Sequence, residues 1–230
     1  SQAQCHLEST GAVPSLANPL AKRIVSSEIS SYGQGWVVGD HSTDEVIAYF
    51  NGADWQAFGP LSNVPNVDIN ALSLLSYGDL WAVGDREGGD ALFLHWDGAS
   101  WTRVLPGGSV GNENLNSVDC VTTNDCWAVG GGRAFAFWNG VSWGAGNVQT
   151  TGTPATGEVP NVTMNSVSCV DSNDCWAVGN RDSGDAVFVH WDGLQWLRVL
   201  PDASVANANL SSVHCSASDN CWAVGTKEGN

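Results

Sequence analysis

The sequence predicts an all-β protein made of five repeated units, because one tryptophan motif recurs along the chain and no long segment has helical periodicity. The tetrapeptide Trp-(Ala/Val)-Val-Gly begins at intervals of 45, 46, 49 and 46 residues, at Trp36, Trp81, Trp127, Trp176 and Trp222. No stretch of comparable length has the i, i+3, i+4, i+7 apolar spacing of an amphipathic helix. Four short strands in a repeat of this length are typical of a propeller blade. We therefore predict a five-bladed β-propeller of four-stranded antiparallel blades.

The fourth repeat shows the strand order expected within one blade. Its β-like segments are residues 165–170, 175–179, 186–191 and 196–200, and short runs of turn residues separate them. Asp192-Gly193 is a tight-hairpin signal, and Asn-Gly or Asp-Gly stands at the same place in the first three repeats. In repeat two the third segment, residues 91–96, is apolar on both faces. A strand covered by neighbouring blades on both sides would have this pattern.

The repeat boundaries predict one domain with a divided last blade. We expect blade one at 24–60, blade two at 66–107, blade three at 112–148, blade four at 161–201, and blade five from 206–230 together with 1–23. The fifth repeat ends soon after its Trp motif, and the 23 residues before the first repeat are long enough to supply its missing strands. Such closure would remove the free edge of a propeller. The alternative is that the chain is part of a longer propeller with further blades.

Six of the seven cysteines stand in three pairs of identical spacing. The expected disulfides are Cys120–Cys126, Cys169–Cys175 and Cys215–Cys221. Each pair flanks a short hairpin, where facing residues lie about 4.5–5.5 Å apart, within disulfide range. Zinc sites favour closer spacing, so we expect no metal and no other cofactor. Disulfides indicate an oxidising compartment, and a start at Ser1 fits removal of a signal peptide, so we expect an extracellular or cell-surface protein. Cys5 is left as a free or intermolecular thiol.

The charge balance excludes two classes of partner. The chain has 8 Lys and Arg against 24 Asp and Glu, a formal net charge of −16. Such an acidic protein would be repelled by nucleic acid and by anionic membrane surfaces. No apolar run approaches the ~20 residues that a membrane helix needs, so we expect no membrane insertion.

The order of a Trp-Ala-Val strand followed by Trp-(Asp/Asn)-Gly-x-x-Trp resembles the repeats of tectonin and BNR-type propellers. In the fourth repeat the resemblance rests on Trp176-Ala177-Val178 and on the segment 191–196. Repeats two and three carry the same residues, and the resemblance covers nearly the whole chain. It differs from the Asp box of sialidases and from WD40 repeats. It implies a propeller, and glycan binding is frequent among tectonin-like proteins, although a fold does not by itself determine function.

All twelve tryptophans occupy repeat positions, which favours a structural role for them. The candidates for sugar platforms are those that open the fourth strand of each blade, because we expect them to be the least buried: Trp55, Trp101, Trp143 and Trp196. His95 and His190 align with Tyr49 and Phe137, so we interpret them as occupants of an aromatic position. Asn161 and Asn209 begin possible glycosylation sequons.

No catalytic residue is predicted. The sequence has no nucleophile elbow and no phosphate-binding glycine loop. The acids of the turns between second and third strands recur equivalently, which favours solvated turn residues over a calcium site. Glycosidases use carboxylates with distinct roles, and no asymmetric pair stands out here.

The leading hypothesis is a non-enzymatic structural or interaction module that associates with itself or with an extracellular protein or glycan. If residues 1–23 closed the last blade of a neighbouring molecule, head-to-tail association would build filaments. The first alternative is a multivalent glycan-binding lectin, and the second is a glycosidase.

Overall fold

The computed structural model describes residues 23–30, 33–41, 44–58, 67–86, 90–107, 110, 113–153, 157–181, 185–205 and 207–227. Apart from one short 3-10 turn at Gly131–Arg133, the regular structure in these ranges is β-strand. The described part of the chain contains no helix that is long and apolar enough to cross a bilayer. The prediction of an all-β protein is confirmed.

The strands form five antiparallel sheets in chain order. The first sheet contains β1 (Arg23–Ile29), β2 (Gly35–His41), β3 (Asp44–Phe50) and β4 (Trp55–Phe58). The second contains β5 (Val67–Ser76), β6 (Asp79–Arg86), β7 (Asp90–Trp96) and β8 (Trp101–Arg103). The third contains β9 (Leu115–Thr122), β10 (Asp125–Gly130), β11 (Phe135–Trp138) and β12 (Trp143–Ala145). The fourth contains β13 (Thr163–Asp171), β14 (Asp174–Asn180), β15 (Ala186–Trp191) and β16 (Trp196–Val199), and the fifth contains β17 (Ala208–Ala217) and β18 (Asn220–Lys227).

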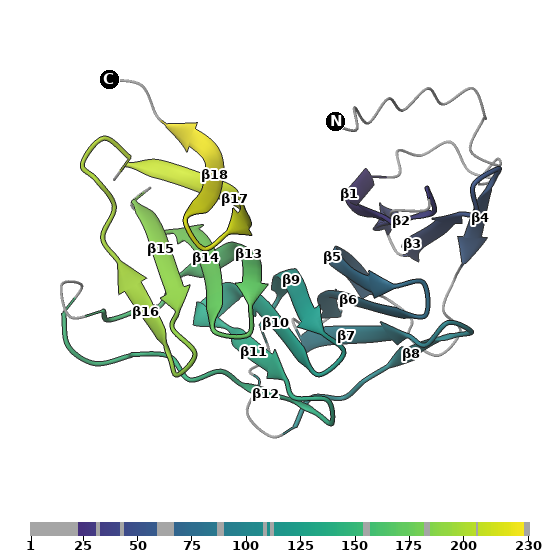
Figure 1. Cartoon of the computed structure of the whole chain (residues 1–230), viewed down its shortest axis with the longest axis horizontal. Coiled ribbons are helices and arrows are strands. Elements are labelled where there is room, and N and C mark those ends of the chain that lie inside the picture. The colour runs from purple at the N-terminus through teal and green to yellow at the C-terminus, as the bar shows by residue number, and fades with distance from the viewer. Residues whose placement is uncertain are drawn as a thin grey trace.

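The sheets stand side by side in an open arc (Figure 1). The first strands, β1, β5, β9, β13 and β17, lie innermost and contact one another in sequence, and the fourth strands lie at the periphery. The first sheet and the β17–β18 pair are the two ends of the arc. The prediction of five blades is not confirmed, because the described strands form four four-stranded sheets and one two-stranded sheet, and no ring closes. The expected completion of blade five by residues 1–23 falls almost wholly outside the described residues.

The apolar run of a second strand that lies between two sheets is explained by burial on both faces. In β10, Trp127 and Val129 point toward the fourth sheet and pack in one cluster with Cys175 and Ala177 of β14. Alternate residues of that same β10 strand pack with the preceding sheet. Successive side chains of a strand face opposite ways, so a strand between two sheets needs apolar residues at every position.

The glycine of the motif is required by a bulge in the neighbouring strand. The register between β13 and β14 shifts between Met164 and Ser166. This shift brings the Thr163 carbonyl oxygen onto the place where a side chain at Gly179 would begin. The motif glycines of sheets two, three and five face the same kind of obstruction. A β-bulge therefore gives the physical reason for the glycine that recurs in the tetrapeptide motif.

The insert between the third and fourth sheets packs against the outer strand β16. Val148 forms a parallel bridge with Trp196, and the Trp196 amide donates to the Asn147 carbonyl over 2.8 Å. Val159 of the same insert is fully buried in the core between these sheets. The insert thus extends the outer edge of the fourth sheet.

Candidate functional site

Neighbouring sheets are joined by a repeated arrangement of three tryptophans. The Trp of a second strand meets, edge to face, the Trp that opens the fourth strand of the next sheet. The ring centroids are 5.6, 5.1 and 5.2 Å apart and the interplanar angles are 87°, 86° and 89° for Trp36–Trp101, Trp81–Trp143 and Trp127–Trp196. The same second-strand Trp also contacts the Trp that ends the third strand of that next sheet. The ring centroids are 5.1, 4.7 and 4.6 Å apart for Trp36–Trp96, Trp81–Trp138 and Trp127–Trp191. Such edge-on and tilted contacts are the favoured geometries of aromatic pairs.

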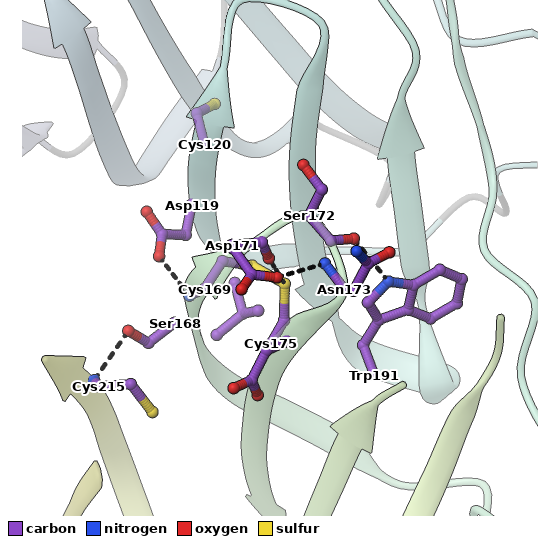
Figure 2. The surroundings of a disulfide bond; sticks show 12 residues. Asp119, Cys120, Ser168, Cys169, Asp171, Ser172, Asn173, Cys175, Trp191 and Cys215 are labelled. Atoms are coloured by element: carbon purple, nitrogen blue, oxygen red, sulfur yellow. Dashed lines mark hydrogen bonds between the residues drawn. A yellow bond between two sulfur atoms is a disulfide. The ribbon is translucent and has the colours of Figure 1, made fainter. Parts of the chain in front are cut away.

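Backbone pairing and one hydrogen bond hold the third-strand Trp in place. Its indole N–H donates to a carbonyl in the preceding hairpin turn, to Tyr77, Thr123 and Ser172 in the second, third and fourth sheets. Figure 2 shows the last of these bonds, between Trp191 and Ser172. In each case the acceptor lies four residues before the second-strand Trp of its own sheet.

This arrangement is incomplete between the fourth and fifth sheets. Trp176 is placed as Trp127 is, but the two-stranded fifth sheet presents no aromatic pair to it among its described residues. Trp176 is only partly buried, whereas Trp36, Trp81 and Trp127 are at most 2% exposed. A cavity of about 300 Å³ opens beside it, lined by Trp176, Phe188, Val213, Ser218, Asp219, Cys221 and Ala223. We call this cavity the hairpin pocket.

The outer face of β18 carries a second set of exposed apolar side chains. Trp222 is 73% exposed and Val224 is 60% exposed, and both point away from the fourth sheet. The opposite end of the arc exposes Ile24 and Ile29 of β1, and its β3–β4 hairpin carries the Phe50–Trp55 ring pair at 5.3 Å. Both ends therefore show the kind of surface that is buried between the inner sheets.

A ladder of hydrogen bonds joins the innermost strands. In sheets two to four, one side chain of the first strand accepts a hydrogen bond from a backbone amide of the next first strand: Ser73 from Cys120 at 3.0 Å, Asp119 from Cys169 at 2.7 Å, and Ser168 from Cys215 at 3.0 Å. Figure 2 shows the last two of these bonds beside the Cys169–Cys175 disulfide. The ladder explains why Ser73 and Ser168 are buried polar residues.

The ladder position also gathers the titratable groups that the sequence reasoning missed. Glu28, Asp119 and His214 occupy it in the first, third and fifth sheets, each opposite the motif Trp of its second strand. Burial raises the pKa of Glu28, and the Asp119 carboxylate raises it further. Burial also raises the pKa of Asp119, while backbone N–H groups and His214 act to lower it. The acids on the inner strands therefore have different environments, and we did not predict them as candidates. The sequence signal was the change of residue type at one repeat position.

The two aligned histidines each pair with an acid. His95–Asp79 and His190–Asp174 have Nε2–Oδ1 distances of 2.8 Å, and each imidazole lies over the motif Trp of its own sheet. In the third sheet Phe137 replaces the histidine, and the matching Asp125 has a buried Oδ1 without a hydrogen-bond partner. The interpretation of an aromatic position agrees with the stacking, but it missed the carboxylates. They could have been found as the acid two residues before the motif Trp.

The proposed glycan platforms do not share one environment. Trp143 and Trp196 are 0% exposed, so they present no ring face to a sugar. Trp101 and Trp55 are partly buried. The expectation that fourth-strand tryptophans are the least buried is thus wrong for two of the four, because the motif Trp of the preceding sheet covers them.

The remaining predicted positions lie as follows. The three cysteine pairs are at disulfide distance, with S–S separations of 2.07, 2.11 and 2.07 Å for Cys120–Cys126, Cys169–Cys175 and Cys215–Cys221. Asn161 is exposed in a bend, whereas Asn209 lies within β17 and is partly buried. Cys5 lies outside the described residues. Within the described ranges, no three His, Cys, Asp or Glu side chains gather in a way that could hold a metal ion.

Comparisons with solved structures find proteins of similar architecture. The structure of YCF48 bound to a D1 peptide matches with a TM-score of 0.62 at 16% identity, over 90% of this chain and 61% of that chain. This structure and the further ones below are β-propellers, so the chain has a β-propeller fold. YCF48 from Cyanidioschyzon merolae matches with a TM-score of 0.59 at 17% identity, over 87% of this chain and 62% of that one. The six-bladed β-propeller lectin of Aleuria aurantia, described with a fucose recognition mode, matches with a TM-score of 0.57 at 12% identity, over 90% and 71% of the two chains.

The propeller therefore spans about three fifths of the length of the two YCF48 structures. At these identities the likeness concerns the fold alone. No protein-family model matches the sequence, and no curated protein is significantly similar to it. The propeller fold that the resemblance implied is supported, whereas the assignment to tectonin or BNR-type repeats is not confirmed.

Proposed function

We propose that this propeller is a non-enzymatic interaction module of the extracellular space, and that its two open ends join one copy to the next. The observation that supports this most is Trp222. Its counterparts in the first three sheets are at most 2% exposed, whereas Trp222 is 73% exposed on the outer face of β18. A large exposed aromatic side chain on a strand whose second edge has no partner among the described residues favours a binding surface.

The two ends of the arc are chemically complementary. Inside the arc each motif Trp packs against the ring pair at the hairpin of the following sheet. The Phe50–Trp55 pair occupies this hairpin position in the first sheet, and the described residues contain no sheet before it. Trp222 of one copy would pack there on Phe50 and Trp55 of a second copy. Such a head-to-tail contact repeats without limit unless its rotation closes a ring, so it would build filaments.

Two features support placing the protein outside the cell. Three cysteine pairs at disulfide distance need an oxidising compartment to persist. The net charge of −16 keeps such a module soluble and away from anionic surfaces.

The test is the native mass of the full chain, measured by size-exclusion chromatography with light scattering over a range of concentrations. The wild type should exceed 24.1 kDa in a concentration-dependent manner, and Trp222→Ser and Val224→Arg should each remain at 24.1 kDa. Ala223→Arg, on the opposite face of the same strand, is the matched control and should associate as the wild type does. A wild type that stays at 24.1 kDa at every concentration would contradict the proposal. Repeating the series with reductant separates a contribution of Cys5.

A glycan-binding role is the second candidate, favoured by the free ring of Trp222, because sugars stack on exposed aromatic faces. A glycan array probed with the wild type and with Trp222→Ser tests it: binding that depends on Trp222 supports a lectin. Hydrolysis of an arrayed or soluble glycan that is lost in Glu28→Gln or Asp119→Asn would instead indicate a glycosidase.

A further inference from the structure

We infer that Tyr49 and Tyr77 form an oxidative cross-linking site, at which hydrogen peroxide and a haem peroxidase would join the two phenol rings as dityrosine. The new bond would tie the first sheet to the second. The site lies on the inner side of the first sheet, at its contact with the next sheet, so neither open end of the arc takes part.

The two phenol rings face each other across the boundary between the sheets. Tyr49 lies in β3, and Tyr77 lies in the hairpin turn between β5 and β6. Their ring centroids are 5.6 Å apart with an interplanar angle of 58°, and a hydrogen bond joins their side chains. The indole N–H of Trp96 donates to the Tyr77 carbonyl over 3.0 Å, which holds the turn in place. The two rings are therefore already assembled, and a small rotation of one of them would bring the coupling carbons together.

This pairing of phenols distinguishes the first boundary from the others. Tyr49 stands opposite the motif Trp of its sheet, and Tyr77 lies four residues before the motif Trp of the next sheet. Coupling of this kind needs two rings that are each activated by a hydroxyl group. The residues at the same two positions of the next three boundaries do not provide them: His95 with Thr123, Phe137 with Ser172, and His190 with Ser218.

The difference in exposure between the two tyrosines determines where oxidation begins. Tyr77 is 50% exposed, whereas Tyr49 is 5% exposed. The oxidant would therefore take the first electron from Tyr77, whose phenolic proton leaves to solvent. The Tyr77 radical then takes a hydrogen atom from Tyr49 across the hydrogen bond that joins them. A second oxidation at Tyr77 leaves one radical on each ring, so the buried ring reacts without leaving its place.

The coupling step balances with one molecule of peroxide. The two radicals pair to form one carbon–carbon bond between the ring carbons next to the hydroxyl groups. Each bonded carbon then passes its hydrogen to its own ring oxygen, which restores both phenols. The protein has lost two electrons and two protons, and these convert hydrogen peroxide to two molecules of water. A natural source of peroxide rests on the extracellular placement proposed above, whereas the reaction itself is tested with added oxidant.

The experiment treats the dilute full-length chain with hydrogen peroxide and a haem peroxidase, and then digests it with a protease that cleaves before aspartate. This cleavage releases Tyr49 on residues 44–53, Tyr77 on residues 68–78 and Tyr32, the third tyrosine of the chain, on residues 1–39. Mass spectrometry should find 44–53 joined to 68–78 with the loss of two hydrogens. The intact product should show dityrosine fluorescence and migrate as a single chain under denaturing conditions.

Phenylalanine variants identify the rings that react. Tyr49→Phe and Tyr77→Phe should each lose the joined peptides, and Tyr77→Phe changes a half-exposed side chain, so its folding is not at risk. Tyr32→Phe is the matched control and should give the same product as the wild type. The inference is overturned if the joined peptides are absent, if they persist in Tyr77→Phe, or if 68–78 is found joined to a second copy of itself.

The effect on the fold is measured on the same samples. Because a cross-link constrains the unfolded chain, the oxidised wild type should unfold at a higher urea concentration than oxidised Tyr77→Phe. Equal midpoints would contradict the role of the bond in tying the first two sheets together. The proposal of self-association fails separately, because it is tested by the native mass without oxidant, and Trp222→Ser should form the cross-link as the wild type does.

Discussion

Replacing Gly179 by alanine tests whether the strand bulge, rather than chance, fixes the glycine of the repeated motif. A Cβ at this position would overlap the Thr163 carbonyl oxygen and lie 3.0 Å from the Met164 Cα. The obstructing atoms are backbone, and Met164 is fully buried, so no flexible side chain can move aside. Strands β13 and β14 would have to separate by about 1 Å at this point to restore ordinary van der Waals contact.

The expected cost is at the upper end of the range for overpacking a buried site, about 3 kcal/mol. For a chain of 230 residues this corresponds to a fall in the thermal midpoint of about 6–12 °C. Urea denaturation followed by tryptophan fluorescence, with the cysteines kept oxidised, measures the change in the free energy of unfolding.

Gly144→Ala is the matched control. Gly144 also lies in a strand, and a Cβ added there would meet no atom within 4 Å. This variant should unfold within about 0.5 kcal/mol of the wild type. If Gly179→Ala unfolded at the same urea concentration as Gly144→Ala, the explanation of the motif glycine by steric exclusion would be refuted.

Three further experiments test the inner contacts. Phe137→His should stabilise the third sheet by about 1 kcal/mol by giving Asp125 a partner, and the gain should vanish when Asp125→Asn is added, as a thermal double-mutant cycle would show. Burial raises the pKa of Asp119, so its protonation favours folding. The stabilising contribution of protonated Asp119 is complete below the ordinary aspartate pKa of 3.8 and is lost as the pH rises through the higher pKa of the folded state. Asp119→Asn should therefore reduce the gain in stability on acidification from pH 7, measured by urea midpoints across a pH series. Asn165→Ala removes one hydrogen bond to Asn180 and one to the Leu210 carbonyl of the next sheet, so it should cost about 2 kcal/mol and speed amide exchange in β17, whereas unchanged exchange would contradict that role.

Local patterns in the sequence were enough to predict the hairpins. Asp192 accepts hydrogen bonds from the amides of Leu194 and Gln195, and Gly193 has a φ of 88°, so the Asp-Gly signal acts through its own backbone. Cys169 and Cys175 stand opposite one another in the β13–β14 register, as the spacing predicted. These features depend on residues that are close along the chain.

Contacts between sheets could not be read in the same way. Trp196 opens an outer strand, which suggested exposure, yet Trp127 from the preceding sheet lies edge-on against it. Asn165 carries a hydrogen bond across the sheet boundary that depends on a bulge, and bulges leave no mark in an apolar pattern. The hairpin pocket likewise depends on two neighbouring sheets, because its lining combines Trp176 and Phe188 of the fourth sheet with described residues of β17 and β18.

The placement of the disulfides has a mechanical consequence. Each of the three bonds joins two strands of the same sheet, so among the described residues no covalent link other than the main chain connects one sheet to another. The free energy of unfolding of the arc is then the sum of one contribution from each sheet and one from each contact between neighbouring sheets. Under tension or heat the array should come apart one sheet at a time from its ends, where a sheet has a single neighbour. The disulfide-bonded hairpins would survive as small cross-linked units after the interfaces between them had opened.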